Sequence, residues 1–240
     1  MLSKNTRSGK IRQIAQNNNW QYQEFIDFSD AIKQANFGIL NYSQNAIFRH
    51  VIQADGTHDN LGFNTFDCRA IEPTGIHNSS MILFNLKLPP QFNNLHFCID
   101  RHNQESDAFT DVSKQQAIKN QYRMQKLTPL ATHQIPKVFD SLYCEQNNEQ
   151  TVGAAKIDIY ANEPAQAYRF LHEVAADTEN ETSLMNWLLA HPHLHIEISS
   201  GMLLVYQKNH LIQEVSLIAA ITVVAELAKI LSQAELKLDL

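Results

Sequence analysis

The chain has 240 residues and a mass of 27.4 kDa, with 44% hydrophobic and 18% charged residues and a formal net charge of −6 at pH 7. This balance is typical of a folded protein, and the low counts of glycine and proline, 7 each, exclude collagen-like and Gly/Pro-rich disordered classes. The negative net charge argues against a general nucleic-acid binder.

The first residues and the cysteines indicate in which cellular compartment the protein is expected. The first ten residues are basic, but no continuous apolar run follows them, so we expect no secretory signal. The 3 cysteines, Cys68, Cys98 and Cys144, are far apart in the sequence, and their odd number cannot pair completely within one chain. We therefore expect reduced thiols in a cytoplasmic protein.

Residues 1–100 are predicted to form a helix followed by an antiparallel β-meander. Ile11, Ile14 and Ala15 have helical spacing and predict a helix over 7–17, which the three asparagines at 17–19 end. The aromatic residues Trp20 and Tyr22 predict a short strand, and a second short helix is predicted over 25–33. Period-two alternation then predicts four strands, within residues 44–54, 61–71, 80–88 and 95–100.

The first of these four strands has one face that we expect to carry Ala46, Phe48, His50 and Ile52 together. Turn residues separate the strands, and no helices intervene, which indicates antiparallel pairing.

Residues 101–152 are polar and show no regular period, so they are predicted to be a connecting segment between two halves. We expect a helix near 111–126 and a second around 136–142. Residues 153–240 predict the order strand, helix, helix, hairpin, helix, with Asn162 as the N-cap of the first helix and the second helix beginning at Thr182 or Ser183. The predicted class is α+β.

The closing helix, predicted over 213–233, is apolar around most of its circumference, so it should be buried on most sides. Only eleven residues separate Glu214 from Glu226, whereas a membrane span needs about 20 apolar residues, so we expect no transmembrane segment. Two interpretations remain open: a core helix under a sheet, or a helix that also contacts a second subunit in a homodimer.

Several short segments together resemble a bacterial family of the domain-of-unknown-function kind. The resemblance covers most of the chain, and it rests on residues 19–22, 50–52, 66–68, 88–92, 157–160, 196–197 and 203–207. Some members of that family carry membrane-spanning helices ahead of the shared region. The resemblance implies a fold and no catalytic residue.

One candidate metal site is present in the sequence. His193, His195 and Glu197 occupy alternate positions of a predicted strand, so their side chains would point the same way and could hold a divalent metal ion. The alternative is a solvent-exposed polar face opposite the apolar residues Leu194, Ile196 and Ile198.

Few other residues or motifs in the sequence suggest a catalytic or cofactor-binding site. A cysteine paired with a distant histidine could act as a nucleophile, but Cys68 and Cys98 lie in apolar strand patterns where cysteine is usually a small buried side chain. No nucleotide-binding glycine motif, G-x-S-x-G, H-E-x-x-H or paired C-x-x-C is present. The sequence therefore favours a non-catalytic protein- or peptide-binding scaffold without a cofactor. A metal-dependent or thiol enzyme is the alternative.

Overall fold

The computed structural model of the chain describes residues 6–26, 35, 37, 40, 46–58, 61–72, 75–101, 125–126, 157–175 and 178–232. These residues form an α+β fold with antiparallel strand pairing, as the sequence predicted. The chain divides into two compact units, Met1–Leu86 with Met202–Lys229, and Lys87–Gly201 with Ile230–Leu240. Most of the predicted connecting segment lies outside the described residues, and so does the helix predicted around 136–142. Of the helix predicted near 111–126 only residues 125–126 are described, and they form a short strand instead.

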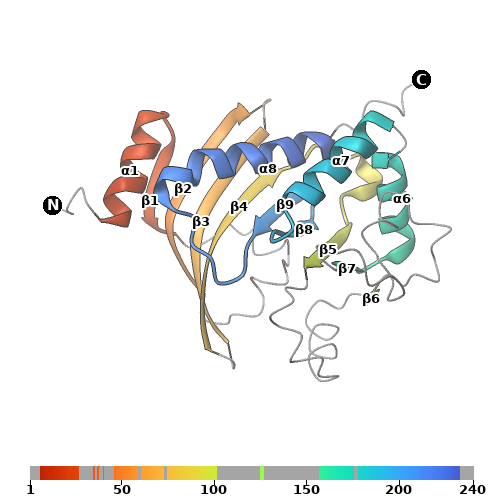
Figure 1. The fold of residues 1–240 in the computed structure, drawn as a ribbon, viewed down its shortest axis with the longest axis horizontal. Coiled ribbons are helices and arrows are strands. Elements are labelled where there is room, and N and C mark those ends of the chain that lie inside the picture. The colour runs from red at the N-terminus through yellow and green to blue at the C-terminus, as the bar shows by residue number, and fades with distance from the viewer. Residues whose placement is uncertain are drawn as a thin grey trace, which may run out of the picture. The chain divides into compact units, whose positions relative to one another are not determined.

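The first unit contains three of the four strands of the predicted meander, together with β1 and one strand from later in the chain, whereas the fourth, predicted over 95–100, belongs to the second unit. The strand order of the first unit is β1-β2-β3-β4-β9, and each of these pairs is antiparallel (Figure 1). The elements are α1 (Arg7–Asn17), β1 (Gln21–Phe25), β2 (Ile47–His58), β3 (Leu61–Glu72), β4 (Gly75–Asn85), β9 (Met202–Tyr206), the 3-10 helix η4 (Glu214–Ser216) and all but the last three residues of α8 (Leu217–Ser232).

Helix α1 has the predicted bounds because both of its ends are capped. The Thr6 hydroxyl accepts a hydrogen bond from the Gly9 N–H at 3.2 Å, which satisfies one of the unpaired donors of the first turn. At the other end, the Asn18 side chain donates to the Ile14 carbonyl, and Asn19 has a φ of 57° that ends the helix. Phe25 belongs to β1, so the short helix predicted over 25–33 does not begin there, and its residues 27–33 are outside the described part.

Strand β2 contains a bulge that the sequence did not reveal. Arg49 pairs with Asp67 and Ile52 with Thr65, so three steps along β2 match two steps along β3. His50 is at this irregularity with a φ of 55°. Because the bulge shifts the alternation by one residue, Phe48 packs with Val51 in the core, and the prediction that Phe48, His50 and Ile52 share one face is wrong.

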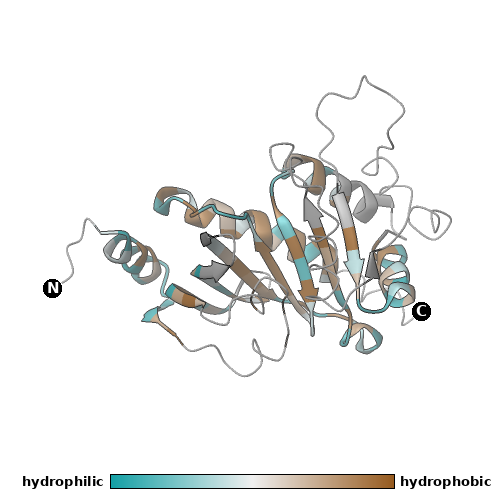
Figure 2. Cartoon of the chain, turned by 90° about the horizontal axis from the view of Figure 1, so that it is seen from below, coloured by the Kyte–Doolittle hydropathy of each residue, from teal (hydrophilic) through white to brown (hydrophobic). Residues whose placement is uncertain are grey.

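Both faces of the first sheet are buried at its inner strands β4 and β9, whereas β1 and the beginning of β2 are exposed or half-buried. The inner strands carry long apolar stretches (Figure 2). One face forms a cluster with Ala35 and Phe37, and its strand residues are Val51, Phe66, Cys68, Met81, Leu83, Met202, Leu204 and Tyr206. On the other face, α1 contacts β1, β2 and η4, and α8 runs across the strands (Figure 1).

Helix α8 is buried along one stripe, consisting of Leu217, Ile221, Val224, Leu227, Ala228 and Leu231. The opposite side is exposed, with Ile218 at 45%, and Val215 of η4, just before the helix, is 88% exposed. The prediction of burial on most sides is therefore wrong. By length and composition alone, the segment Glu214–Ser232 would be able to cross a membrane.

The second unit has the strand order β8-β5-β7-β6, again antiparallel. Its elements are the 3-10 helix η1 (Pro90–Phe92), β5 (His96–Arg101), β6 (Gln125–Lys126), β7 (Ile157–Ala161), α6 (Pro164–Ala175), α7 (Thr178–Ala190) and β8 (His195–Ser199). Helix α7 begins four residues or more before its predicted start.

The apolar core of the second unit lies on the face of its sheet that carries Phe97. The Phe170 ring of α6 packs against the Phe97 and Phe92 rings, with centroids 6.1 Å and 5.3 Å apart. The prediction that Asn162 is the N-cap of this helix is wrong by one residue, because α6 begins at Pro164 and the Glu163 carbonyl accepts the first helical hydrogen bond, from the Ala167 N–H. The Asn162 side-chain oxygen instead accepts hydrogen bonds from the N–H groups of Glu163 (2.9 Å) and His96 (3.0 Å), and so joins the segment before α6 to β5.

Candidate functional site

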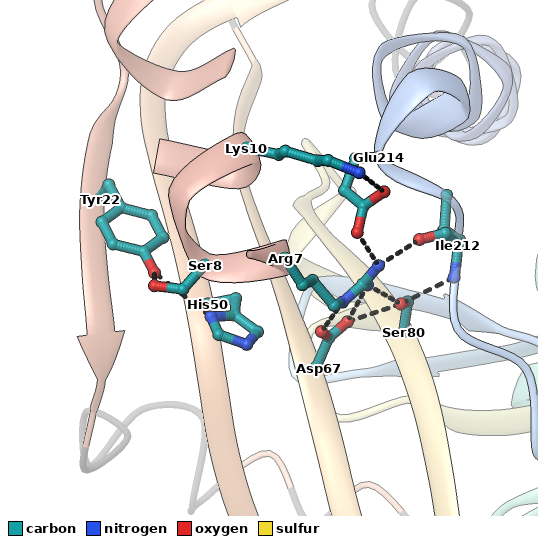
Figure 3. Close-up of polar contacts among 9 residues, drawn as sticks. All are labelled: Arg7, Ser8, Lys10, Tyr22, His50, Asp67, Ser80, Ile212 and Glu214. Carbon is teal, nitrogen blue, oxygen red and sulfur yellow. Dashed lines mark hydrogen bonds and ion pairs between the residues drawn. The ribbon is translucent and has the colours of Figure 1, made fainter. Parts of the chain in front are cut away.

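The first unit contains a polar cluster centred on Arg7, at the beginning of α1 (Figure 3). The Arg7 guanidinium donates to both carboxylate oxygens of Asp67 on β3, Nε to Oδ2 at 2.7 Å and Nη2 to Oδ1 at 2.8 Å. Its Nη1 donates to the Ile212 carbonyl at 2.8 Å and to Glu214 Oε1 at 3.3 Å. We call Arg7, Asp67, Ser80, Ile212 and Glu214 the Arg7 cluster.

Ser80 on β4 completes this network. Its hydroxyl donates to Asp67 Oδ1 at 2.6 Å and accepts from the Ile212 N–H at 2.9 Å. The pKa of Arg7 is raised, because burial, which lowers it, is outweighed by the hydrogen bonds and charges of Asp67 and Glu214. Asp67 is committed to Arg7 and Ser80, so the cluster fastens α1 and the segment before α8 to the sheet rather than offering a reactive acid.

A second polar group lies beside this cluster and links α1 to β1 and β2. The Ser8 hydroxyl is 2.9 Å from the Tyr22 hydroxyl, which is 3.2 Å from His50 Nδ1. Burial lowers the pKa of His50. Asp67 and Glu24 raise it, Arg7 and Arg49 lower it, and the net shift is downward. The imidazole is therefore neutral at pH 7, and its tautomer sets the direction of the two hydrogen bonds: each of the Ser8 hydroxyl, the Tyr22 hydroxyl and Nδ1 can donate or accept.

The left-handed backbone of His50 costs energy for a residue with a side chain, and such strain persists only where the surroundings enforce it. Here the bulge turns His50 toward Tyr22, as Figure 3 shows. Ser8 is only 6% exposed, so its hydroxyl is not presented to solvent as a nucleophile would be. The Ser8–Tyr22–His50 chain satisfies three polar groups under α1.

Neither polar group was predicted from the sequence. Arg7 is 60 residues from Asp67 and 207 residues from Glu214 in the chain. No local period or motif connects them, and only the antiparallel pairing of β3 with β4 brings Asp67 opposite Ser80.

The predicted metal ligands are only partly together. His195 and Glu197 lie two residues apart on β8, so they are on one face as predicted, but β8 begins at His195, and the prediction that His193 belongs to the same strand is wrong. His193 is exposed in the turn before β8, whereas His195 is 3% and Glu197 0% exposed. The alternative of a solvent-exposed polar face is also wrong, since every residue of β8 is buried.

A residue that the sequence analysis did not single out joins Glu197. His96 Nε2 on β5 is 4.0 Å from Glu197 Oε2, and this nitrogen is buried without a hydrogen-bond partner. The only signal in the sequence was its position at the beginning of a predicted strand. Among the residues that the structure describes, no group of three or more His, Cys, Asp or Glu is arranged to hold a metal ion.

The cysteines occupy separate places. Cys68 is 2% exposed in the apolar cluster of the first unit, and Cys98 is 3% exposed on β5, where it pairs in register with Glu197. Cys144 lies outside the described residues.

Comparisons with family models, with curated proteins and with solved structures find no match to this chain. The resemblance to a bacterial domain family therefore stays a prediction.

Proposed function

We propose that the chain is a non-catalytic protein-binding module that associates with a second copy of itself through the outer face of α8. We define this outer face as Ile218, Ala219 and Thr222 of α8, with Val215 of η4 and Leu211 of the segment before η4. The observation that supports the proposal is the exposure of these residues on, and just before, a helix whose other side is buried. Apolar residues grouped on one exposed surface are characteristic of interaction sites.

The outer face is more apolar than its residue types indicate. The Thr222 hydroxyl donates to the Ile218 carbonyl at 3.1 Å, within the same helix. Its hydrogen-bonding capacity is thus partly used inside the helix. Three of the remaining residues, Leu211, Val215 and Ile218, are 40%, 88% and 45% exposed.

A second copy is the partner that this surface fits most simply. A two-fold axis places the same patch on both sides of the contact, so an apolar stretch meets an apolar stretch without a separate complementary protein. Farther along the same exposed stripe, Glu226 and Lys229 are charged and exposed. They would form a polar rim, as interfaces between folded proteins usually have.

The attachment of α8 supports the same proposal. Glu214, one residue before Val215, is held by Arg7 and lies 3.7 Å from Lys10 Nζ. The beginning of the helix is therefore fixed to α1 and the sheet, and a fixed surface loses less conformational entropy on association.

The test is the oligomeric state of the full chain, measured by light scattering at tens of micromolar, a range in which a stable dimer is populated. We expect a dimer for the wild type and a monomer for Val215→Glu. Leu189→Glu is the matched control, because Leu189 is an apolar residue of α7 that is 55% exposed. A monomeric wild type, or equal loss of the dimer in both variants, would contradict the proposal.

Membrane binding is the competing outcome for the same surface. Cosedimentation of the wild type, but not of Val215→Glu, with vesicles of neutral and anionic phospholipids would show that lipid rather than a second copy covers α8.

A further inference from the structure

The exposed side of α8 has a regular spacing of residues. Val215 of η4 and Ala219, Thr222, Glu226 and Lys229 of α8 are all exposed, and each is four or three residues from the next. A repeat that averages 3.5 residues keeps such positions on one seam when two helices pack lengthwise, as in coiled coils. The outer face therefore fits a second helix that lies along α8, and in a second copy of the chain that helix is α8 itself.

The polarity of this stripe changes along the helix. Val215, Ile218 and Ala219, near its beginning, are apolar, and the Thr222 hydroxyl donates to the Ile218 carbonyl of the same chain. Glu226, four residues after Thr222, is charged and exposed. If two copies of α8 ran parallel, each residue would meet its own copy, so the two Glu226 carboxylates would face each other across the contact. Opposed like charges are unfavourable at an interface, and this disfavours the parallel arrangement.

We propose that two copies of the chain pack α8 antiparallel, with the two-fold axis between Ile218 and Ala219; the inference rests on the proposed function, in which the partner is a second copy. About this axis Ile218 opposes Ala219 of the second copy. Val215 and Thr222 are equally far from the axis on its two sides, so Val215 opposes Thr222 of the second copy. Apolar residues thus meet apolar or internally bonded ones, and the short Ala219 side chain lets the helices approach closely.

The antiparallel arrangement also gives Glu226 a favourable place. It would lie beside the beginning of the helix of the other copy, where the N–H groups of the first turn favour negative charge. The carboxylate already there, Glu214, is bound by Arg7 at 3.3 Å and lies 3.7 Å from Lys10 Nζ, so its charge is compensated within its own chain. The Lys10 side chain is 52% exposed at the same end. The charges of the chain therefore favour antiparallel packing over parallel packing.

Disulfide cross-linking tests the orientation, because a disulfide forms only where two Cα atoms come within about 7 Å. The full chain is used with Cys144→Ser in every sample, and Cys68 and Cys98 are buried. We expect oxidation with diamide to link Ala219→Cys into a covalent dimer, because the two copies of this position would be only about 1.5 Å apart along the helix. Glu226→Cys is the matched control on the same side of α8. Its two copies would be about 22 Å apart along the helix and should stay unlinked.

A mixing experiment keeps the test decisive if Ala219→Cys does not fold or associate. Antiparallel packing predicts that an equimolar mixture of Val215→Cys and Thr222→Cys gives a cross-linked heterodimer, whereas either variant alone gives none. Parallel packing predicts the reverse, because each position would then meet its own copy.

The outcomes separate the orientation of the helices from the association itself. Light scattering of each sample before oxidation shows whether the dimer is present. A dimer that cross-links through Glu226→Cys, or only in the unmixed samples, would overturn the antiparallel arrangement and leave the proposed association through α8 in place. A dimer that cross-links in none of the samples would overturn both, because its contact would lie elsewhere on the chain, and so would a monomeric wild type.

Discussion

Arg7 and Asp67 form a two-pronged ion pair, 2.7 Å and 2.8 Å long, between the first turn of α1 and the middle of β3. The side chains are 24% and 15% exposed, so the pair is largely shielded from water. Through Ile212 and Glu214, the same guanidinium also holds the segment that leads into α8. One side chain thus connects the N-terminal helix, the sheet and the helix on which the proposed interface lies.

Replacing Arg7 with methionine should destabilise the first unit. The change keeps much of the aliphatic volume but leaves the Asp67 carboxylate without its cationic partner, which costs about 2–4 kcal/mol. The free energy of unfolding, measured by urea denaturation, is the readout.

Arg169→Met is the control for this prediction. Arg169 forms an ion pair of similar length with Glu173, 2.8 Å, but its side chain is 60% exposed. Exposed pairs contribute little, so the change should cost less than about 1 kcal/mol. Similar losses in the two variants would show that the Arg7 cluster is no stronger than a surface pair.

Asn162→Ala should destabilise the second unit. The side-chain oxygen accepts from two backbone N–H groups, those of His96 and Glu163, and one of them is at the beginning of α6. Loss of these two hydrogen bonds costs about 0.5–1.5 kcal/mol each. Asn162→Asp keeps the acceptor oxygens and should retain most of the stability in the same urea experiment, whereas equal losses would contradict the role of the side-chain oxygen.

The elements that the sequence predicted well are those whose signal is local. The bounds of α1 follow from its apolar spacing and the asparagines after Asn17, and the meander follows from period-two alternation between turn residues. The bulge at His50 adds a single residue to the alternation, and no residue type in this segment marks where such an insertion occurs.

The features that could not be predicted from the sequence are those that depend on tertiary packing. Helix α8 is apolar on both sides, so its residue types could not tell the buried stripe from the outer face. Alternation in β8 indicated one apolar face and one polar face, but it could not show that the polar one is buried next to His96. Arg7 finds its partners through tertiary contacts alone.

The left-handed backbone at His50 predicts a difference between two substitutions. Valine is β-branched and strongly disfavoured at a φ of 55°, whereas asparagine tolerates it. Both remove the imidazole bonded to Tyr22, so His50→Val should be less stable than His50→Asn by about 1–2 kcal/mol. The difference in urea midpoints measures this. Equal stability of the two variants would show that the bulge relaxes to ordinary strand geometry.

Stability should fall with acidification in two steps, and the first reports on His50. Because the pKa of His50 in the folded protein is lowered from 6.5, chiefly by burial, the unfolded chain binds a proton more readily. The contribution of neutral His50 is complete above pH 6.5 and is lost as the pH falls through that value toward the folded pKa. Urea midpoints measured against pH should show this step in the wild type but not in His50→Gln.

The second step reports on Glu214. Burial raises the pKa of Glu214, but a hydrogen bond from its own backbone and the charges of Lys10 and Arg7 outweigh burial and lower the pKa from 4.5. Its contribution is therefore present above pH 4.5 and is lost as the pH falls below it. Glu214→Gln should remove this step and leave the one near pH 6.5. If Glu214→Gln instead abolished the step near pH 6.5, or if the wild type gained stability on acidification, the assignment of the two steps to these residues would be wrong.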